Sequence, residues 1–138
     1  MENYLKYKNL MPYDSFLMCQ AGLELPCKSV QTGQFRNDLV AILRPHAIYM
    51  AKRHTCNHDG FKNSRAEQIM KICGGSPMEV VAMHSGMVSN PIDAAKQIFY
   101  QWRNSPGHWH AINSVCRYYC YSLGQVGNSY YGIGIVIK

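Results

Sequence analysis

Two β-rich segments near the C-terminus constrain the fold of this 138-residue chain more than any other feature. Residues 115–123 and 130–137 are rich in tyrosine, valine and isoleucine, and the stretch Gly-Gln-Val-Gly-Asn-Ser between them predicts a loop that closes an antiparallel hairpin. The segments carry the tyrosines Tyr118, Tyr119, Tyr121, Tyr130 and Tyr131. A hairpin buries so many aromatic side chains on both faces only when helices cover each side. The sequence therefore favours a small antiparallel sheet between helices.

Helical periodicity accounts for much of the chain before this hairpin. Over residues 34–51 the apolar positions recur at helical spacing and Pro45 interrupts them, which predicts two consecutive helices or one kinked helix. The Ser-x-x-Glu sequence at residues 64–67 has the form of a capping box, in which each side chain bonds the other's backbone N–H. It predicts a short helix that ends at Gly74.

A further helix is predicted where Asn90 supplies an N-cap and Pro91 takes the first helical position. Its apolar face extends to Trp102. Residues 78–84 form a short apolar run that fits a strand or a turn equally well. Because no repeat, linker or low-complexity stretch divides the chain, its length favours one globular domain.

The cysteines predict disulfide bonds. Their number is even and they form no Cys-x-x-Cys pair, which favours up to three disulfides and an oxidising compartment over a zinc knuckle. Six cysteines allow fifteen pairings, so the connectivity stays open. Residues four apart on a straight strand are too distant to bridge, so the last two pair only if the strand bends. The six are Cys19, Cys27, Cys56, Cys73, Cys116 and Cys120.

Charge and hydropathy restrict the partners of the chain. The net charge is +6, but the basic residues are scattered rather than clustered on one element, which argues against nucleic-acid binding. No apolar run is long enough to span a bilayer. The N-terminus lacks the pattern of a signal peptide, so we expect a mature, secreted chain from which that peptide has been removed.

Three residues that could bind a metal or transfer protons lie in short sequence motifs. Residues 102–108 read Trp-Arg-Asn-Ser-Pro-Gly-His, and their last residue is His108. His58 follows Ala-Ile-Tyr-Met-Ala at residues 47–51. Glu79 lies between the two histidines in Met-Glu-Val. Two histidines and a carboxylate in one cleft could bind a metal or transfer protons.

These motifs resemble the CAP superfamily of cysteine-rich secretory, antigen 5 and pathogenesis-related 1 proteins. Residues 102–108 match the bacterial-type form W-x-x-S-P-G-H, whereas the family's G-E-N triplet keeps only Glu79. The resemblance implies a divergent SCP-like domain with an α+β fold, a three-layer α-β-α sandwich, here with disulfide stabilisation. It covers residues 33–138 of a single domain, 1–138, and leaves 1–32 as an irregular N-terminal extension.

The departures from the family pattern bear on chemistry. Ser105 stands where eukaryotic members carry a second glutamate, and Trp109 and Ala111 replace the arginine and asparagine common after the bacterial histidine. Met78 and Val80 replace the glycine and asparagine of the triplet. The resemblance thus implies a His-Glu-His set with fewer polar neighbours, which favours weak metal affinity and no robust peptidase turnover.

We therefore predict a secreted, non-enzymatic binding or effector module. Its cleft contains His58, Glu79, Ser105 and His108 and recognises a small ligand, a lipid or a protein partner that the sequence does not identify. The oligomeric state is likewise open. In the alternative, a metal-dependent hydrolase or peptidase, His58 and His108 hold Zn²⁺ or another divalent ion and Glu79 activates water.

Two further alternatives use other residues. A cysteine hydrolase would pair a thiol nucleophile with His108 as its base, but it requires an unbridged cysteine. A disulfide-rich toxin or inhibitor scaffold would act through surface loops such as residues 1–32.

His108 and His110 would point in opposite directions if they lay on a strand, so only one of them would face a given cleft.

Overall fold

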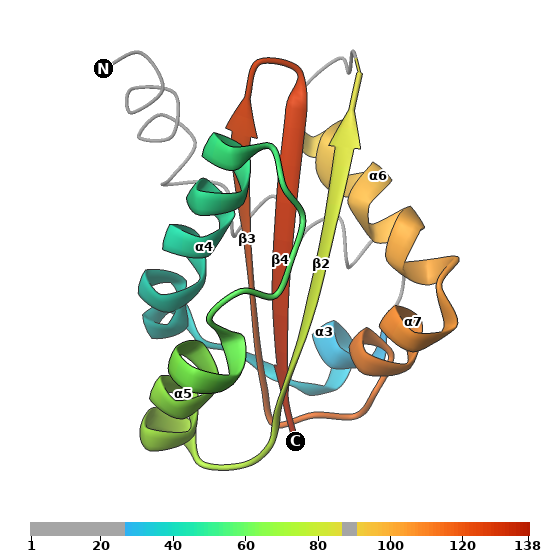
Figure 1. The fold of residues 1–138 in the computed structure, drawn as a ribbon. Helices are drawn as coiled ribbons and strands as arrows, with labels where there is room; N and C mark the ends of the chain where they lie inside the picture. The colour runs from blue at the N-terminus through green and yellow to red at the C-terminus, as the bar shows by residue number, and fades with distance from the viewer. Residues whose placement is uncertain (1–26, 87–90) are drawn as a thin grey trace.

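The computed structural model describes residues 27–86 and 91–138 and arranges them as helices around one central sheet (Figure 1). The helices are α3 (Lys28–Thr32), α4 (Val40–Arg53), α5 (Ala66–Cys73), α6 (Pro91–Arg103) and α7 (Pro106–Ile112), with a 3-10 turn at Asn37–Leu39 and a π-helical turn at Phe61–Arg65. The strands are β1 (Gln34–Phe35), β2 (Pro77–Ser85), β3 (Tyr118–Val126) and β4 (Ser129–Ile137).

The sheet has the strand order β1-β3-β4-β2. Strand β4 pairs antiparallel with both β2 and β3, which confirms the predicted hairpin and assigns the apolar run at 78–84 to a strand. The short β1 pairs in parallel with β3, so the sheet is mixed and the prediction of a purely antiparallel sheet is wrong. The predicted six-residue loop is also wrong: β3 continues to Val126, and the turn uses Gly127, whose φ of +55° suits a tight hairpin.

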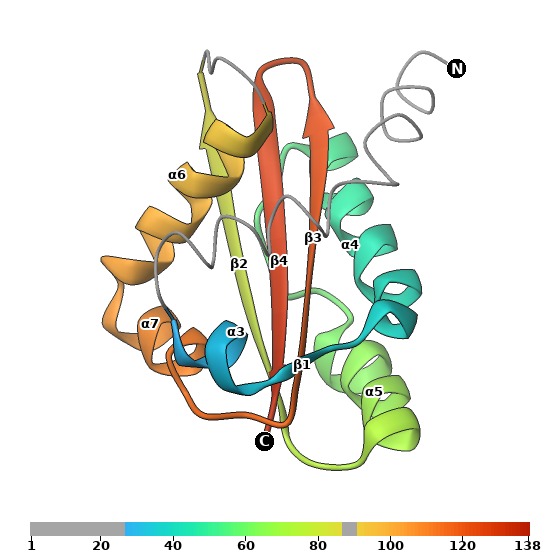
Figure 2. The same ribbon diagram turned by 180° about the vertical axis from the view of Figure 1, so that it is seen from behind.

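Helices cover both faces of the sheet, which the sequence requires for its strand tyrosines (Figures 1 and 2). Helices α4 and α5 lie on one face, and α3, α6 and α7 lie on the other. The alternation along β4 separates two cores: Ile133 and Ile135 face α4 and α5, whereas Val136 faces the opposite layer.

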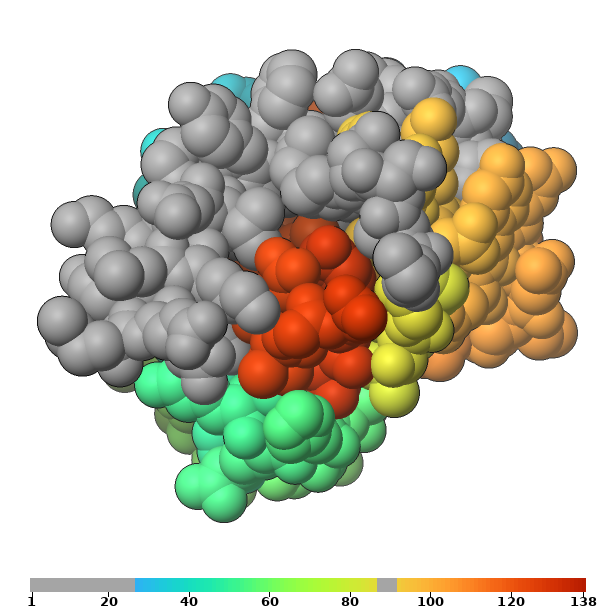
Figure 3. Space-filling model, turned by 90° about the horizontal axis from the view of Figure 1, so that it is seen from above, coloured from blue at the N-terminus to red at the C-terminus, as the bar shows by residue number. Residues whose placement is uncertain are grey.

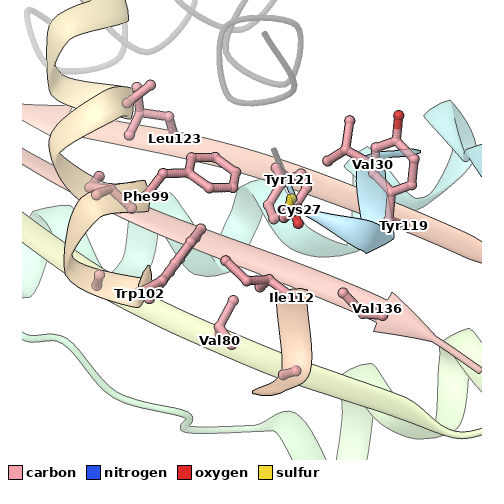
Figure 4. Close-up of a cluster of buried hydrophobic side chains, with 14 of the residues drawn as sticks. Cys27, Val30, Val80, Phe99, Trp102, Ile112, Tyr119, Tyr121, Leu123 and Val136 are labelled. Carbon is pink, nitrogen blue, oxygen red and sulfur yellow. The ribbon is translucent and has the colours of Figure 1, made fainter. Parts of the chain in front are cut away.

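The core under α3, α6 and α7 is aromatic (Figure 4). The ring of Phe99 contacts the rings of Trp102 and Tyr121 edge-on, with centroids 5.0 and 5.1 Å apart. The Trp102 indole N–H donates to the carbonyl of Val81 at 3.1 Å, so this fully buried ring also satisfies its polar atom. Aromatic packing and this hydrogen bond fix α6 against β2.

The core under α4 and α5 is mainly aliphatic and includes Leu43, Met50 and Ile69. Helix α4 approaches β3 closely at Gly124, where a Cβ would lie 2.6 Å from the carbonyl oxygen of Ala47. A side chain at this position would push the helix away from the sheet. Seen from above, the β3–β4 end (red) lies between residues near the end of α4 (green) and the end of β2 (yellow) (Figure 3).

The predicted helices are confirmed in part and corrected in part. Helix α4 is a single helix with Pro45 inside it, so the prediction of two consecutive helices is wrong. It begins at Val40 rather than near residue 34, because Gln34–Phe35 form strand β1. The predicted capping box does not form, because the Phe61–Arg65 turn precedes α5 and Ser64 instead accepts a hydrogen bond from Gln68. Helix α6 begins at Pro91 as predicted, whereas its predicted cap, Asn90, lies outside the described residues.

The prediction of disulfide stabilisation is wrong for the part of the chain that the structure describes. Among residues 27–86 and 91–138 no cysteine forms a disulfide bond. Cys116 belongs to the aromatic core and Cys120 to the aliphatic core, so the sheet separates their side chains. The described cysteines Cys27, Cys56, Cys73, Cys116 and Cys120 therefore contribute no covalent crosslink, and Cys19 lies outside the described residues.

Candidate functional site

The candidate site lies along β2, which is an edge strand of the sheet. Val81 belongs to the core on the α4–α5 side, and Glu79, two positions earlier, points to that same side. Val80 belongs to the core under α6 and α7. The edge of β2 thus joins the two helical layers, and residues from both layers reach it.

Glu79 is the centre of an ionic network on the first side. Arg65 donates from Nε to Oε2 at 2.7 Å and from Nη2 to Oε1 at 2.8 Å, a bidentate pair. The Glu79 side chain is 1% exposed and that of Arg65 is 8% exposed. Nδ1 of His58 lies 2.9 Å from Oε1 of Glu79. Both carboxylate oxygens are therefore engaged.

The chemistry of this contact determines how His58 presents its ring. A carboxylate paired with arginine only accepts hydrogen bonds, so Nδ1 of His58 carries the proton and donates it. The other ring nitrogen, Nε2, is then the acceptor when the ring is neutral. The His58 side chain is 50% exposed, so its ring reaches solvent while its Nδ1 edge is anchored.

The loop that carries His58 is held at several points. Arg65 also donates from Nη1 to the carbonyl of Asp59 at 2.6 Å. His46, on α4, donates from Nε2 to the carbonyl of Asn57 at 2.8 Å. Burial lowers the pKa of His46, so it is neutral at neutral pH and keeps this role. The backbone on both sides of His58 is thereby positioned.

His108 reaches the site from the other layer. The structure places it on helix α7, so the strand considered for residues 108–110 is wrong; Pro106 at the first turn of the helix explains why. Nδ1 of His108 lies 3.0 Å from Oγ of Ser105. Burial lowers the pKa of His108, and the nearby charge of His58 lowers it further.

Two hollows flank this edge of the sheet. One, of about 510 Å³, is lined by residues that include His58, Lys62 and Glu79. The second, of about 420 Å³, is lined by Cys56, Met83, Gln101, Trp102, Ser105 and His108 among others. The amide of Gln101 donates to the carbonyl of Met83 at 2.7 Å. This hydrogen bond and the one from the Trp102 indole N–H to Val81 occupy two carbonyls on the free edge of β2. They limit the pairing of another strand with that edge.

Residues 28–131 match the family model of CAP, the cysteine-rich secretory protein family. The chain belongs to this family. Among solved structures, an outer surface protein from Borrelia burgdorferi is similar in fold, with a TM-score of 0.59 and 14% sequence identity over 98% of this chain and 90% of that one. A comparison with curated protein sequences finds no match.

The residues of this CAP domain do not fit a three-ligand metal centre. Among the described residues, no group of three or more histidine, cysteine, aspartate and glutamate side chains is placed to hold a metal ion. Glu79 is engaged by Arg65, whose positive charge beside the carboxylate also disfavours a divalent cation. The predicted metal pair of His58 and His108 is thus left without Glu79, which orients the His58 ring instead.

Sequence reasoning missed two residues of the candidate site. Arg65 falls within the predicted capping box, and nothing in a single sequence distinguishes a buried arginine from an exposed one. Cys56 was assigned to a disulfide, whereas it lines the same hollow as Ser105 and His108. Its thiol pKa is raised by desolvation, which favours the protonated and less nucleophilic form.

Proposed function

We propose that this CAP domain is a binding module whose cleft recognises a small ligand or a partner through His58 and His108. The engagement of Glu79 carries the proposal. A carboxylate that receives a bidentate pair from Arg65 and a third hydrogen bond from His58 is an orienting group. It holds one imidazole in a fixed tautomer, which prepares the ring to accept a hydrogen bond from a ligand.

The same contacts argue against the metal-dependent hydrolase. In that mechanism Glu79 would take a proton from water, which requires an accessible carboxylate of suitable basicity. The side chain of Glu79 is 1% exposed, and its two carboxylate oxygens already accept hydrogen bonds from Arg65 and His58, so a water molecule has little access to them. The thiol alternative gains little support, because the pKa of Cys56 is raised rather than lowered.

The lining of the cleft indicates what the ligand must offer. On one side of β2, His58 contributes an acceptor nitrogen to the hollow beside Glu79. On the other side, Ser105 and Gln101 contribute polar groups to the hollow beside His108, and Met83 contributes an apolar surface that is 38% exposed. A small molecule or peptide group that combines hydrogen-bond donors with an apolar portion fits this set. The uncharged state that the lowered pKa gives His108 at neutral pH does not favour an anion there.

An extracellular location is part of this proposal. It is supported by the family's description as secretory and by the name of the structural neighbour, an outer surface protein. The described cysteines add no support, since none forms a disulfide. No described helix is long and apolar enough to cross a membrane. The toxin or inhibitor alternative loses its disulfide framework within the described residues, and residues 1–26 of its proposed loop region lie outside them.

The experiment combines ligand screening with a search for catalysis. A library of small amines, amides and sugars is screened by saturation-transfer NMR against the wild type, His58→Ala and His108→Ala. We expect compounds whose binding is lost in both variants; compounds that bind all forms equally would contradict the proposal.

In parallel, Zn²⁺ calorimetry and a peptidase assay should show weak, exchangeable zinc binding and no turnover. Tight stoichiometric zinc with turnover abolished by His108→Ala would instead establish the hydrolase.

A further inference from the structure

We propose that a second pocket, behind α7, binds a small organic anion attached to a flat ring. The pocket has a volume of about 590 Å³, and its lining includes Lys28, Trp109, His110, Asn113 and Lys138. Helix α3, helix α7 and the C-terminal end of β4 lie together at this end of the molecule (Figures 1 and 2). The volume is in the range of small-molecule sites.

The charge of the pocket selects an anion. Two lysines and a histidine contribute to its lining, and no aspartate or glutamate side chain does. Among the described residues, no carboxylate forms an ion pair with Lys28, His110 or Lys138. The backbone oxygen of Lys138 accepts a hydrogen bond from Nε of Arg117 at 2.9 Å, so a further cation lies at this end of β4. The ammonium groups therefore remain available to a ligand.

The aromatic component comes from Trp109. Its indole is half-buried, packs against the aromatic core and lines the pocket. The guanidinium carbon of Arg103 lies 6.0 Å from the ring centroid, which adds positive charge beside the ring. A flat ring can stack on an indole while its attached phosphate or carboxylate meets the lysines.

Helix α7 separates this pocket from the cleft on β2. His108 and His110 are two positions apart on one helix, which places their side chains about 200° apart around its axis. His108 lines the hollow beside Ser105, and His110 lines the pocket beside Trp109. The second site therefore does not depend on the proposed function of the first.

Indole N–H signals provide the test, because the chain has two tryptophans and they occupy different environments. Adenosine 5′-monophosphate, adenosine and inorganic phosphate are titrated separately into the ¹⁵N-labelled protein. We expect the Trp109 signal to shift with the monophosphate more than with either part alone, because ring and anion act together. The Trp102 signal should not shift, since its N–H is buried and bound to Val81. Trp109→Phe assigns the signals.

Charge variants separate specific recognition from general attraction to a basic protein. Lys28→Met and Lys138→Met should each weaken monophosphate binding about two- to fivefold, as expected for loss of one partly exposed ionic contact. Lys71→Met removes the same charge from exposed α5 and should leave affinity unchanged. Equal weakening by all three variants, equal shifts of both indole signals, or no Trp109 shift at millimolar ligand would overturn the proposal.

Discussion

The two halves of the proposed cleft, one around each hollow beside β2, position a histidine in different ways. On the α4–α5 side, His58 is anchored through a buried carboxylate that is itself paired with Arg65. On the α6–α7 side, the one hydrogen-bond partner of the His108 ring among residues 27–86 and 91–138 is the hydroxyl of Ser105. The first arrangement fixes the donor nitrogen of the ring, whereas a hydroxyl can donate or accept and leaves both tautomers open.

This difference indicates a division of roles between the two halves of the proposed cleft. The His58 half is rigid and polarised, and its stability depends on keeping buried charges paired. The His108 half is neutral at neutral pH and can adapt its ring to a ligand's donor or acceptor. Changes to the first half should therefore affect folding strongly, whereas changes to the second should affect mainly the titration and binding of the ring.

The largest effect is expected for Arg65→Met. The substitution keeps an aliphatic side chain but leaves Glu79 buried without its partner, which should lower the free energy of unfolding by about 3–5 kcal/mol. Urea unfolding followed by tryptophan fluorescence provides the measurement. Arg53→Met is the matched control, because this exposed arginine only stacks on Tyr49 and should contribute less than about 1 kcal/mol. Similar losses in the two variants would contradict the proposed role of the network.

Acidification should destabilise the protein next most strongly. The pKa values of His46 and His108 are lowered in the folded state, mainly by burial, so below the ordinary histidine pKa of 6.5 the unfolded chain binds protons more tightly. Their stabilising contribution is fully present above pH 6.5 and is lost as the pH falls through the lowered values.

Unfolding free energies measured from pH 8 to 5 test this dependence. His46→Gln keeps an N–H donor toward Asn57 but cannot take up a proton, so its stability should fall less steeply with acid than that of the wild type. His54→Gln, at an exposed histidine, is the control and should leave the slope of unfolding free energy against pH unchanged. A wild-type curve that is flat between pH 6.5 and 5 would argue against buried neutral histidines.

A smaller effect is expected for Ser105→Ala. The variant removes one neutral, partly exposed hydrogen bond and should cost about 0.5–1.5 kcal/mol. Compared directly with Arg65→Met, this variant tests whether the contacts of the two halves contribute differently to the free energy of unfolding. If the loss from Ser105→Ala equals or exceeds the loss from Arg65→Met, the comparison fails.

The smallest effect concerns the titration of His108. Burial is the main cause of its lowered pKa, and repulsion from His58 is the secondary one. His58→Gln should therefore raise the pKa of His108 toward 6.5 without restoring it fully, as followed by the ring C–H signals in NMR. An unchanged or lower pKa in this variant would mean that the two rings do not share one region.

The sequence predicted the hairpin and helix α6 because each depends on a local pattern, and local motifs also singled out His58, Glu79 and His108, whose role in a site stays a prediction. Alternation identified the strands, Pro91 marked the start of α6, and a short motif marked His108. Local patterns could not identify the partners of those residues, because Arg65 contacts Glu79 only after α5 packs beside β2. Cysteine number was misleading, because Cys116 and Cys120 face different cores on opposite sides of the sheet.

The tautomer of His58 tests the central claim most directly. A long-range ¹H–¹⁵N NMR spectrum at pH 8, with His58→Gln for assignment, distinguishes the two nitrogens of the neutral ring. If Glu79 orients His58, Nδ1 carries the proton, Nε2 is an acceptor facing the cleft, and Arg65→Met weakens this preference. A proton on Nε2 in the wild type would contradict the claim, because the ring could not then donate to Glu79.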